Sequence, residues 1–211
     1  SVDGRLNGVS FASSSLLPKV TWDRIRMGTL TSCSTSLRFD DVAVNDNSGS
    51  YQNSWPDLGS IIYLRPNAAG DSSNWTASSG ANYTCVDETI PNDDTDYVSS
   101  LTANQEDYYN VDNSNLIGTE VVNVVAVSQR SESLVSDSTI SVGVMKTASG
   151  TKTTSGSINV GTTYKTHTKD TPAVYNLTTY TDPDGAAWTP STLDTMQIGI
   201  KELGSISTRV T

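Results

Sequence analysis

The sequence predicts an all-β protein, an antiparallel β-sandwich or jelly roll, and three observations support this class. Hydrophobic residues make up 35% of the 211-residue chain, and Ser and Thr are abundant, which suits short strands with solvated outer faces. Apolar and polar residues alternate over several short segments, as they do in half-buried strands. No stretch carries apolar residues at sustained helical spacing.

Residues 1–46 are predicted to form strands of an incomplete sandwich. The dipeptides Asp3-Gly4 and Asn7-Gly8 mark tight turns around the first of these strands.

A β-bulge is predicted at Asp40–Asp41. Leu37 and Phe39 share one face of a strand, whereas Val42 and Val44 have the opposite parity. One inserted residue would bring all four apolar side chains to the same core.

Residues 47–57 are rich in Asn, Asp, Ser and Pro and are predicted to be a linker. Residues 58–211 are predicted to fold as a jelly-roll-like sandwich of about eight to ten strands. Its first strand is expected at Gly59–Arg65, where Pro66-Asn67 ends it. A long polar loop is expected from Ala68 to Asn82.

The segment from Glu120 to Arg130 is predicted to be a central strand covered on both faces, because its valines are nearly continuous. Alternation predicts half-buried strands around Ile140–Val144 and Met196–Ile200. Further strands are expected at Tyr83–Asp87, Gln105–Val111, Ser157–Thr166 and Ala173–Tyr180, and a turn is expected at Asp182-Pro183-Asp184-Gly185.

The charge of the chain disfavours a nucleic-acid ligand. Its net charge is −10, from 23 acidic and 13 basic residues, and the bases form no run that could follow a phosphate backbone. The plain interpretation is an acidic surface that favours solubility and mutual repulsion of particles. No apolar run approaches the roughly 20 residues of a membrane span, so membrane insertion is not expected.

Two cysteines, Cys33 and Cys85, could form one bridge, although their spacing does not indicate it. We expect buried free thiols and no metal bound by this pair.

The sequence predicts no catalytic residue. His167 is the single histidine, and it lies in a polar stretch that leads to a proline. No serine occupies a nucleophile elbow, and no phosphate-binding glycine loop occurs. A pair of carboxylates across a cleft, as in glycan-cleaving enzymes, stays open as a minor alternative. We therefore expect a protein that is not an enzyme.

The densest acidic cluster runs from Asp87 to Tyr97 and suggests a possible calcium site. Its candidate ligands are the aspartates Asp87, Asp93, Asp94 and Asp96, since calcium takes six to eight oxygen ligands. The spacing is not that of an EF-hand. The alternative is a solvated turn in which Asp and Asn bond to their own backbone.

Tryptophans could supply a platform for sugar binding. Trp55, Trp75 and Trp188 are the candidates, with Trp75 and Trp188 the preferred glycan-binding residues. A tryptophan in a β-sandwich is more often an anchor in the core or in a loop.

Three motifs in residues 1–46 follow one another in order: Asn7-Gly8-Val9, Ile25-Arg26-Met27-Gly28, and Leu37 to Val44 with Phe39-Asp40-Asp41-Val42. They resemble the closing strands of a concanavalin-A-like, laminin-G-like sandwich. The earlier strands of such a domain are missing, and the chain stops in a strand-like stretch, Ser207–Thr211. We therefore expect a piece of a longer protein.

Motifs in residues 58–211 also recur in order: Leu64-Arg65-Pro66-Asn67, Asn74-Trp75-Thr76, Val86-Asp87-Glu88, Pro91 to Val98, Thr181-Asp182-Pro183 and Ala187-Trp188-Thr189. They resemble a domain of uncharacterised structural proteins of tailed bacteriophages. The Asp-rich motif is the most specific of them. The order and spacing of the motifs match that domain over most of residues 58–211. No catalytic residue is carried over from this resemblance.

The resemblance implies a structural protein on the surface of a phage particle (the virion). It would serve as a capsid decoration or as part of a head or tail fibre. Its expected partners are other virion proteins, copies of itself as a homo-oligomer, and host surface glycans. The alternative is a carbohydrate-binding adhesin module that recognises host glycans, an argument from fold alone.

Overall fold

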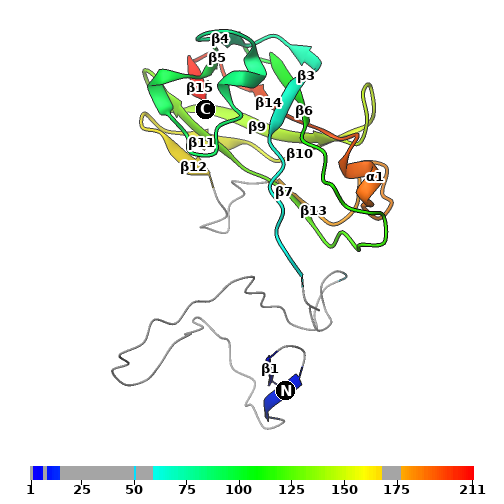
Figure 1. Ribbon diagram of the computed structural model, residues 1–211. Helices are drawn as coiled ribbons and strands as arrows, with labels where there is room; N and C mark the ends of the chain where they lie inside the picture. The colour runs from blue at the N-terminus through cyan, green and yellow to red at the C-terminus, as the bar shows by residue number, and fades with distance from the viewer. Residues whose placement is uncertain (1, 7–8, 15–49, 51–58, 168–176) are drawn as a thin grey trace. The chain divides into compact units, whose positions relative to one another are not determined.

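The computed structural model describes residues 2–6, 9–14, 50, 59–167 and 177–211 (Figure 1). The chain divides into two compact units, Ser1–Ile62 and Tyr63–Thr211. Among the described residues, the regular structure is antiparallel β-strand apart from one short α-helix, α1 (Pro190–Leu193), and two 3-10 turns. The predicted all-β class is confirmed. In this part of the chain, no helix is long and apolar enough to cross a membrane.

The first unit contains a hairpin of β1 (Val2–Leu6) and β2 (Val9–Ser14), in which Leu6 pairs with Val9. The turn predicted at Asp3-Gly4 is wrong, because both residues lie within β1. The ladder is irregular there instead: Gly4 pairs with Ala12 and Arg5 pairs with Ser10. The extra residue of this bulge is therefore Phe11 in β2.

Several predictions for this half concern residues that the structure does not describe. They are the bulge at Asp40–Asp41, the linker 47–57 apart from Ser50, Cys33 and Trp55. The concanavalin-A-like strands stay a prediction.

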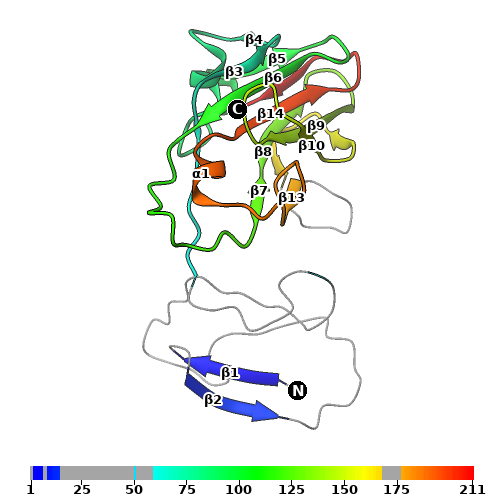
Figure 2. The ribbon, with the colours of Figure 1, turned by 90° about the vertical axis from the view of Figure 1, so that its right-hand side faces the viewer.

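The second unit is built around a six-stranded sheet, here called the first sheet. Its strand order is β10-β9-β14-β6-β3, and β11 also pairs with β9. The strands are β3 (Pro66–Ser73), β6 (Glu106–Val111), β9 (Ser138–Met145), β10 (Lys152–Thr154), β11 (Ile158–Val160) and β14 (Gln197–Glu202). Figure 2 shows β6 and β14 side by side.

A five-stranded second sheet has the order β12-β8-β15-β5-β4. Its strands are β4 (Thr76–Ala77), β5 (Val98–Ser100), β8 (Gln129–Ser133), β12 (Lys165–His167) and β15 (Thr208–Val210). A separate pair is formed by β7 (Val125–Val127) and β13 (Leu177–Thr179). The chain changes from the first sheet to the second between β3 and β4, at Asn74 and Trp75.

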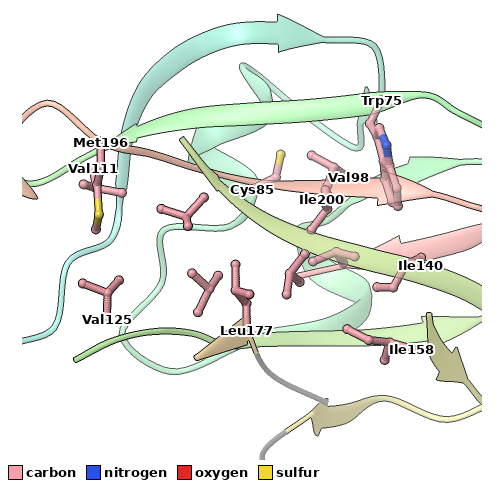
Figure 3. Close-up of a cluster of buried hydrophobic side chains, with 14 of the residues drawn as sticks. Trp75, Cys85, Val98, Val111, Val125, Ile140, Ile158, Leu177, Met196 and Ile200 are labelled. Atoms are coloured by element: carbon pink, nitrogen blue, oxygen red, sulfur yellow. The ribbon is translucent and has the colours of Figure 1, made fainter. Parts of the chain in front are cut away.

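Apolar side chains from both sheets meet in one core (Figure 3). Ile140, Val142 and Val144 come from β9, and Val98 and Val210 come from the second sheet; all are buried. One core shared by two antiparallel sheets is a β-sandwich.

The start of the second unit differs from the prediction. Gly59–Arg65 lies outside the described strands, and the first strand begins at Pro66. Pro is tolerated as the first residue of a strand, so it starts β3 here and does not end one. β3 forms in the polar stretch that was expected to be a loop, because Gly70 lets the backbone of β3 approach that of β6 closely. A Cβ on Gly70 would lie 2.5 Å from the backbone oxygen of Tyr108.

The strand predicted at Tyr83–Asp87 is also wrong. The chain forms a 3-10 turn, η1 (Asn82–Cys85), which places Cys85 in the core. The strand predicted at Gln105–Val111 is confirmed as β6.

The predicted central strand from Glu120 to Arg130 is wrong. Val121 is 81% exposed and Val124 is 40% exposed, and the segment splits into β7 and β8 of two different sheets. β7 begins only at Val125 because its partner strand β13 ends at Thr179, which pairs with Val125. Beyond Thr179 the chain turns at Asp182–Gly185. Among the described strands, none therefore lies beside Val121, Val122 and Val124.

The strand around Ile140–Val144 is confirmed as β9, although it is buried on both faces and not on one. Met145 is 1% exposed and Ser141 is 5% exposed on the face that should meet solvent. Tyr108 from β6 helps to cover this face: a Cβ on Gly143 or on Gly199 would clash with its side chain. Tyr108 thus lies in a groove of glycines, 2% exposed.

The single strand predicted at Ser157–Thr166 is wrong, because this segment divides into β11 of the first sheet and the start of β12 of the second. Met196–Ile200 corresponds to β14, and Ala173–Tyr180 contains β13, although 173–176 lie outside the described residues. The turn at 182–185 is confirmed: Gly185 has φ +86°, and Asp182 Oδ1 accepts hydrogen bonds from the backbone of Asp184 and Ala186.

Replacing Gly199 by alanine is expected to destabilise the protein by about 2 kcal/mol or more, since overpacking a core displaces backbone. A Cβ at this position would lie 2.5 Å from the backbone oxygen of Asp107 and 2.6 Å from the Tyr108 ring. Urea unfolding measures the change. Gly161→Ala is the control, because nothing lies within 4 Å of the place that its Cβ would take; equal stability of the two variants would contradict this packing.

Candidate functional site

Charged side chains gather on the face of the second sheet that points away from the core. In β8, Gln129, Ser131 and Ser133 are buried, whereas Arg130 and Glu132 point to the opposite side. In β15, Arg209 pairs with Glu132 across the ladder. This set of Arg130, Glu132 and Arg209 is called the charged face below.

The acidic loop, residues 86–97, lies against the charged face. Arg130 donates to both carboxylate oxygens of Asp93, through Nε at 2.5 Å and Nη2 at 2.7 Å. Arg209 Nη1 donates to Asp94 Oδ1 at 2.6 Å and lies 3.7 Å from Glu132 Oε1. Bidentate pairing of the kind that Arg130 makes combines charge with a defined orientation.

Aromatic rings complete the arrangement. The Arg209 guanidinium lies 4.1 Å from the centroid of the Tyr97 ring, and that of Arg130 lies 5.5 Å from the Tyr164 centroid. These distances fall within the range of cation–π contacts. Each arginine is therefore held between a ring and a carboxylate.

The electrostatics of the face follow from this geometry. The hydrogen bonds from Arg130 lower the pKa of Asp93 and, in return, raise the pKa of Arg130. Burial raises the pKa of Glu132, and the nearby carboxylate of Asp94 adds to the effect. Two guanidinium groups thus face three carboxyl groups, which makes the face an ionic joint between the loop and the sheet.

Three of the four predicted calcium ligands have other partners here. Asp93 and Asp94 are paired with arginines, and Asp96 Oδ1 accepts a hydrogen bond from Ser78 Oγ at 3.1 Å. Within the described ranges, no group of three or more His, Cys, Asp or Glu side chains could hold a metal ion. The structure gives the calcium site at Asp87, Asp93, Asp94 and Asp96 no support, and it stays a prediction.

The two tryptophans predicted to bind glycans are part of the core. Trp75 is 4% exposed and Trp188 is 3% exposed, and the Trp75 indole N–H donates to the backbone oxygen of Gln105. Neither ring has a face open to a sugar. The predicted glycan-binding role of these residues gains no support, because their large apolar rings are used to fill the sandwich.

Cys85 is a buried free thiol, as expected. Its Sγ donates to the backbone oxygen of Ser79 at 3.0 Å, and burial raises the pKa of the thiol. His167 ends β12, where it pairs with Gln129 of β8.

A surface feature that the prediction missed is the apolar segment, residues 116–124, in the long connection from β6 to β7 (Figure 2). Ile117 is 83% exposed and Val121 is 81% exposed. The side chain of Glu120 accepts hydrogen bonds from the backbone of Ile117, Gly118 and Thr119. The valines of this segment are the feature of the sequence that could have revealed it, but their nearly continuous run predicted burial in a strand.

A second missed feature is Glu202, a carboxyl group with no exposed surface at the end of β14. Its Oε1 accepts hydrogen bonds from Ser138 Oγ at 3.1 Å and from the backbone of Gly204 at 2.9 Å. Burial raises its pKa, although hydrogen bonds from Thr208, Gly204 and Ser138 act in the opposite direction. Nothing in the local sequence marks this glutamate as buried.

Comparisons with protein-family models, with curated proteins and with solved structures found no match for this chain.

The raised pKa of Glu202 predicts a stability that declines as the pH rises. The folded state holds its proton more tightly than the unfolded state, so the contribution is full below the unfolded value of 4.5. It is lost as the pH rises through the folded pKa. Glu202→Gln is expected to stabilise the protein at neutral pH and to flatten this dependence, measured by urea unfolding between about pH 4 and 8.

Glu120→Gln is the control for this experiment. Backbone hydrogen bonds lower the pKa of Glu120, so its contribution is present above the unfolded value of 4.5 and is lost as the pH falls. Its replacement should weaken the protein at neutral pH. A Glu202→Gln variant that behaves in the same way would show that burial does not raise the pKa of Glu202.

Proposed function

We propose that this chain is a non-enzymatic structural protein of a tailed bacteriophage particle, either a capsid decoration or a component of a head or tail fibre. Two features support the proposal. The ordered motifs of residues 58–211 resemble such proteins, and the most specific of them, the Asp-rich one, joins a loop to the sandwich through arginine pairs. These aspartates attach the loop to the sheet, and this structural role explains their presence without a catalytic role.

The observation that carries the proposal is the apolar segment, residues 116–124. Ile117, Val121 and Val124 expose large apolar side chains within one short stretch. Several such side chains together favour a contact with another protein, whereas a single exposed one would need no explanation. The segment also lies outside the described strands, so the backbone of residues 121–124 belongs to no described ladder and can pair with a strand of a partner.

The partners we propose are copies of the same chain and other virion proteins. Copies with a net charge of −10 repel one another in solution. An apolar contact can hold them side by side on a particle, because burial of apolar surface is not weakened by charge of the same sign elsewhere on the surface. The apolar segment would therefore be covered in the assembled particle.

The carbohydrate-binding alternative is less well supported. It requires exposed aromatic rings, and both candidate tryptophans, Trp75 and Trp188, are buried.

The test uses purified particles of the virus that encodes the chain. Mass spectrometry is expected to detect the protein in them, and its absence would overturn the proposal. The variant Val121→Asp places a charge in the proposed contact, where burying it is costly. We expect about tenfold or more loss of incorporation, equivalent to at least about 1.4 kcal/mol of binding.

Val135→Asp is the matched control, since Val135 is 78% exposed on the connection between β8 and β9. Both variants should unfold at the same temperature as the unaltered protein. Equal incorporation of the two variants would show that the apolar segment is not the contact surface.

A further inference from the structure

The acidic loop is attached to the domain with little apolar burial. It connects two fully buried residues, Cys85 and Val98, but every residue from 86 to 97 is exposed or half-buried. Ile90, its one large aliphatic side chain apart from Val86, is 80% exposed. The hydrophobic effect therefore contributes little to holding the loop in place.

Backbone hydrogen bonds hold mainly the end of the loop. Ser78 donates its backbone N–H to the Tyr97 oxygen at 2.8 Å, and the Tyr97 N–H donates to Ser78 Oγ at 2.9 Å. Within the loop, Thr95 donates to the Asn92 oxygen at 3.2 Å. In the middle of the loop, ion pairs take the place of the backbone hydrogen bonds that hold a strand in a sheet.

Those pairs join the loop to two different strands. Asp93 binds Arg130 of β8, and Asp94 binds Arg209 of β15. The Thr211 hydroxyl, next to the end of β15, lies 3.4 Å from Asn92 Oδ1. Each contact depends on a charged or polar group that solvent reaches, since the Asp93 side chain is 37% exposed and that of Asp94 is 74% exposed.

The backbone at Asp93 supports the same conclusion independently. Asp93 has φ +54°, a left-handed conformation that favours glycine and costs free energy for other residues. The ionic contact with Arg130 compensates for this cost in the closed position. Removing the contact removes the compensation, so the loop gains conformational freedom and relieves strain at the same time.

We propose that residues 88–96 form a strap that closes over the charged face through its arginine pairs and opens as a unit when these pairs are lost. The opened state uncovers Arg130, Arg209 and Glu132 while the two sheets stay folded. This inference is independent of the proposed function, because it concerns a movement within one chain.

The variant that tests the strap is Arg130→Gln combined with Arg209→Gln. It leaves Glu132, Asp93 and Asp94 facing one another without a cation, so repulsion adds to the lost attraction. Backbone NMR order parameters of residues 88–96 are expected to fall from about 0.85 to below about 0.6, the range of flexible backbone. Those of β9 and β14 should not change.

The matched control is Lys152→Gln combined with Lys201→Gln. It removes the same formal charge, but from the cations that flank Glu106 on the first sheet. The order parameters of the loop should stay at their original values in this variant. Rigid residues 88–96 in the arginine variant, or a loss of order that extends into β14, would overturn the strap.

A salt titration of the unaltered protein provides a second test, which does not depend on whether a variant folds. At about 1 M salt the screening length is about 3 Å, so exposed pairs weaken while apolar packing does not. The order parameters of residues 88–96 should decrease with salt, and those of β9 should not. A loop whose order is independent of salt would contradict an ionic strap.

Discussion

The arrangement of the second unit depends on a buried carboxyl group, that of Asp107 in β6. It has no exposed surface and accepts hydrogen bonds from the Trp75 backbone at 2.8 Å, from Asn82 Nδ2 at 2.5 Å and from the Tyr109 hydroxyl at 2.9 Å. Trp75 lies where the chain leaves the first sheet for the second, and Asn82 begins η1. One side chain therefore fixes the corner between the sheets and the start of the segment that leads to the acidic loop.

The same strand organises the opposite face of the first sheet. Tyr108, next to Asp107, points the other way and lies against Gly143 and Gly199, and Lys152 Nζ lies 4.5 Å from the centroid of its ring. The glycines leave room for the ring, and the ring replaces the side chains that they lack. β9, for which the sequence predicts one solvated face, is therefore covered on both faces.

Sequence patterns predicted the parts of the fold that are determined locally. The alternation in β9 and β14 and the turn at Asp182–Gly185 follow from neighbouring residues, and all three are present. The errors concern distant partners. Glu120–Val124 has the composition of a strand, but no described strand lies beside it. β3 has a polar composition, but its Gly70 permits pairing with β6. For the acidic loop, the sequence indicated the cluster of aspartates but not their partners. Arg130 and Arg209 lie 37 and 115 residues away from Asp93 and Asp94 in the chain.

The free energy of unfolding of Asp107→Asn tests the central claim most directly. An amide can keep the hydrogen bonds from Asn82 and Tyr109 on its oxygen, but its NH2 group then faces the backbone N–H of Trp75. One hydrogen bond is lost and two donors meet in a fully buried place. We predict a loss of about 3 kcal/mol relative to the unaltered protein, compared with less than about 0.5 kcal/mol for Asp137→Asn, an exposed control. Equal stability of the two variants would contradict the view that Asp107 joins the sheets.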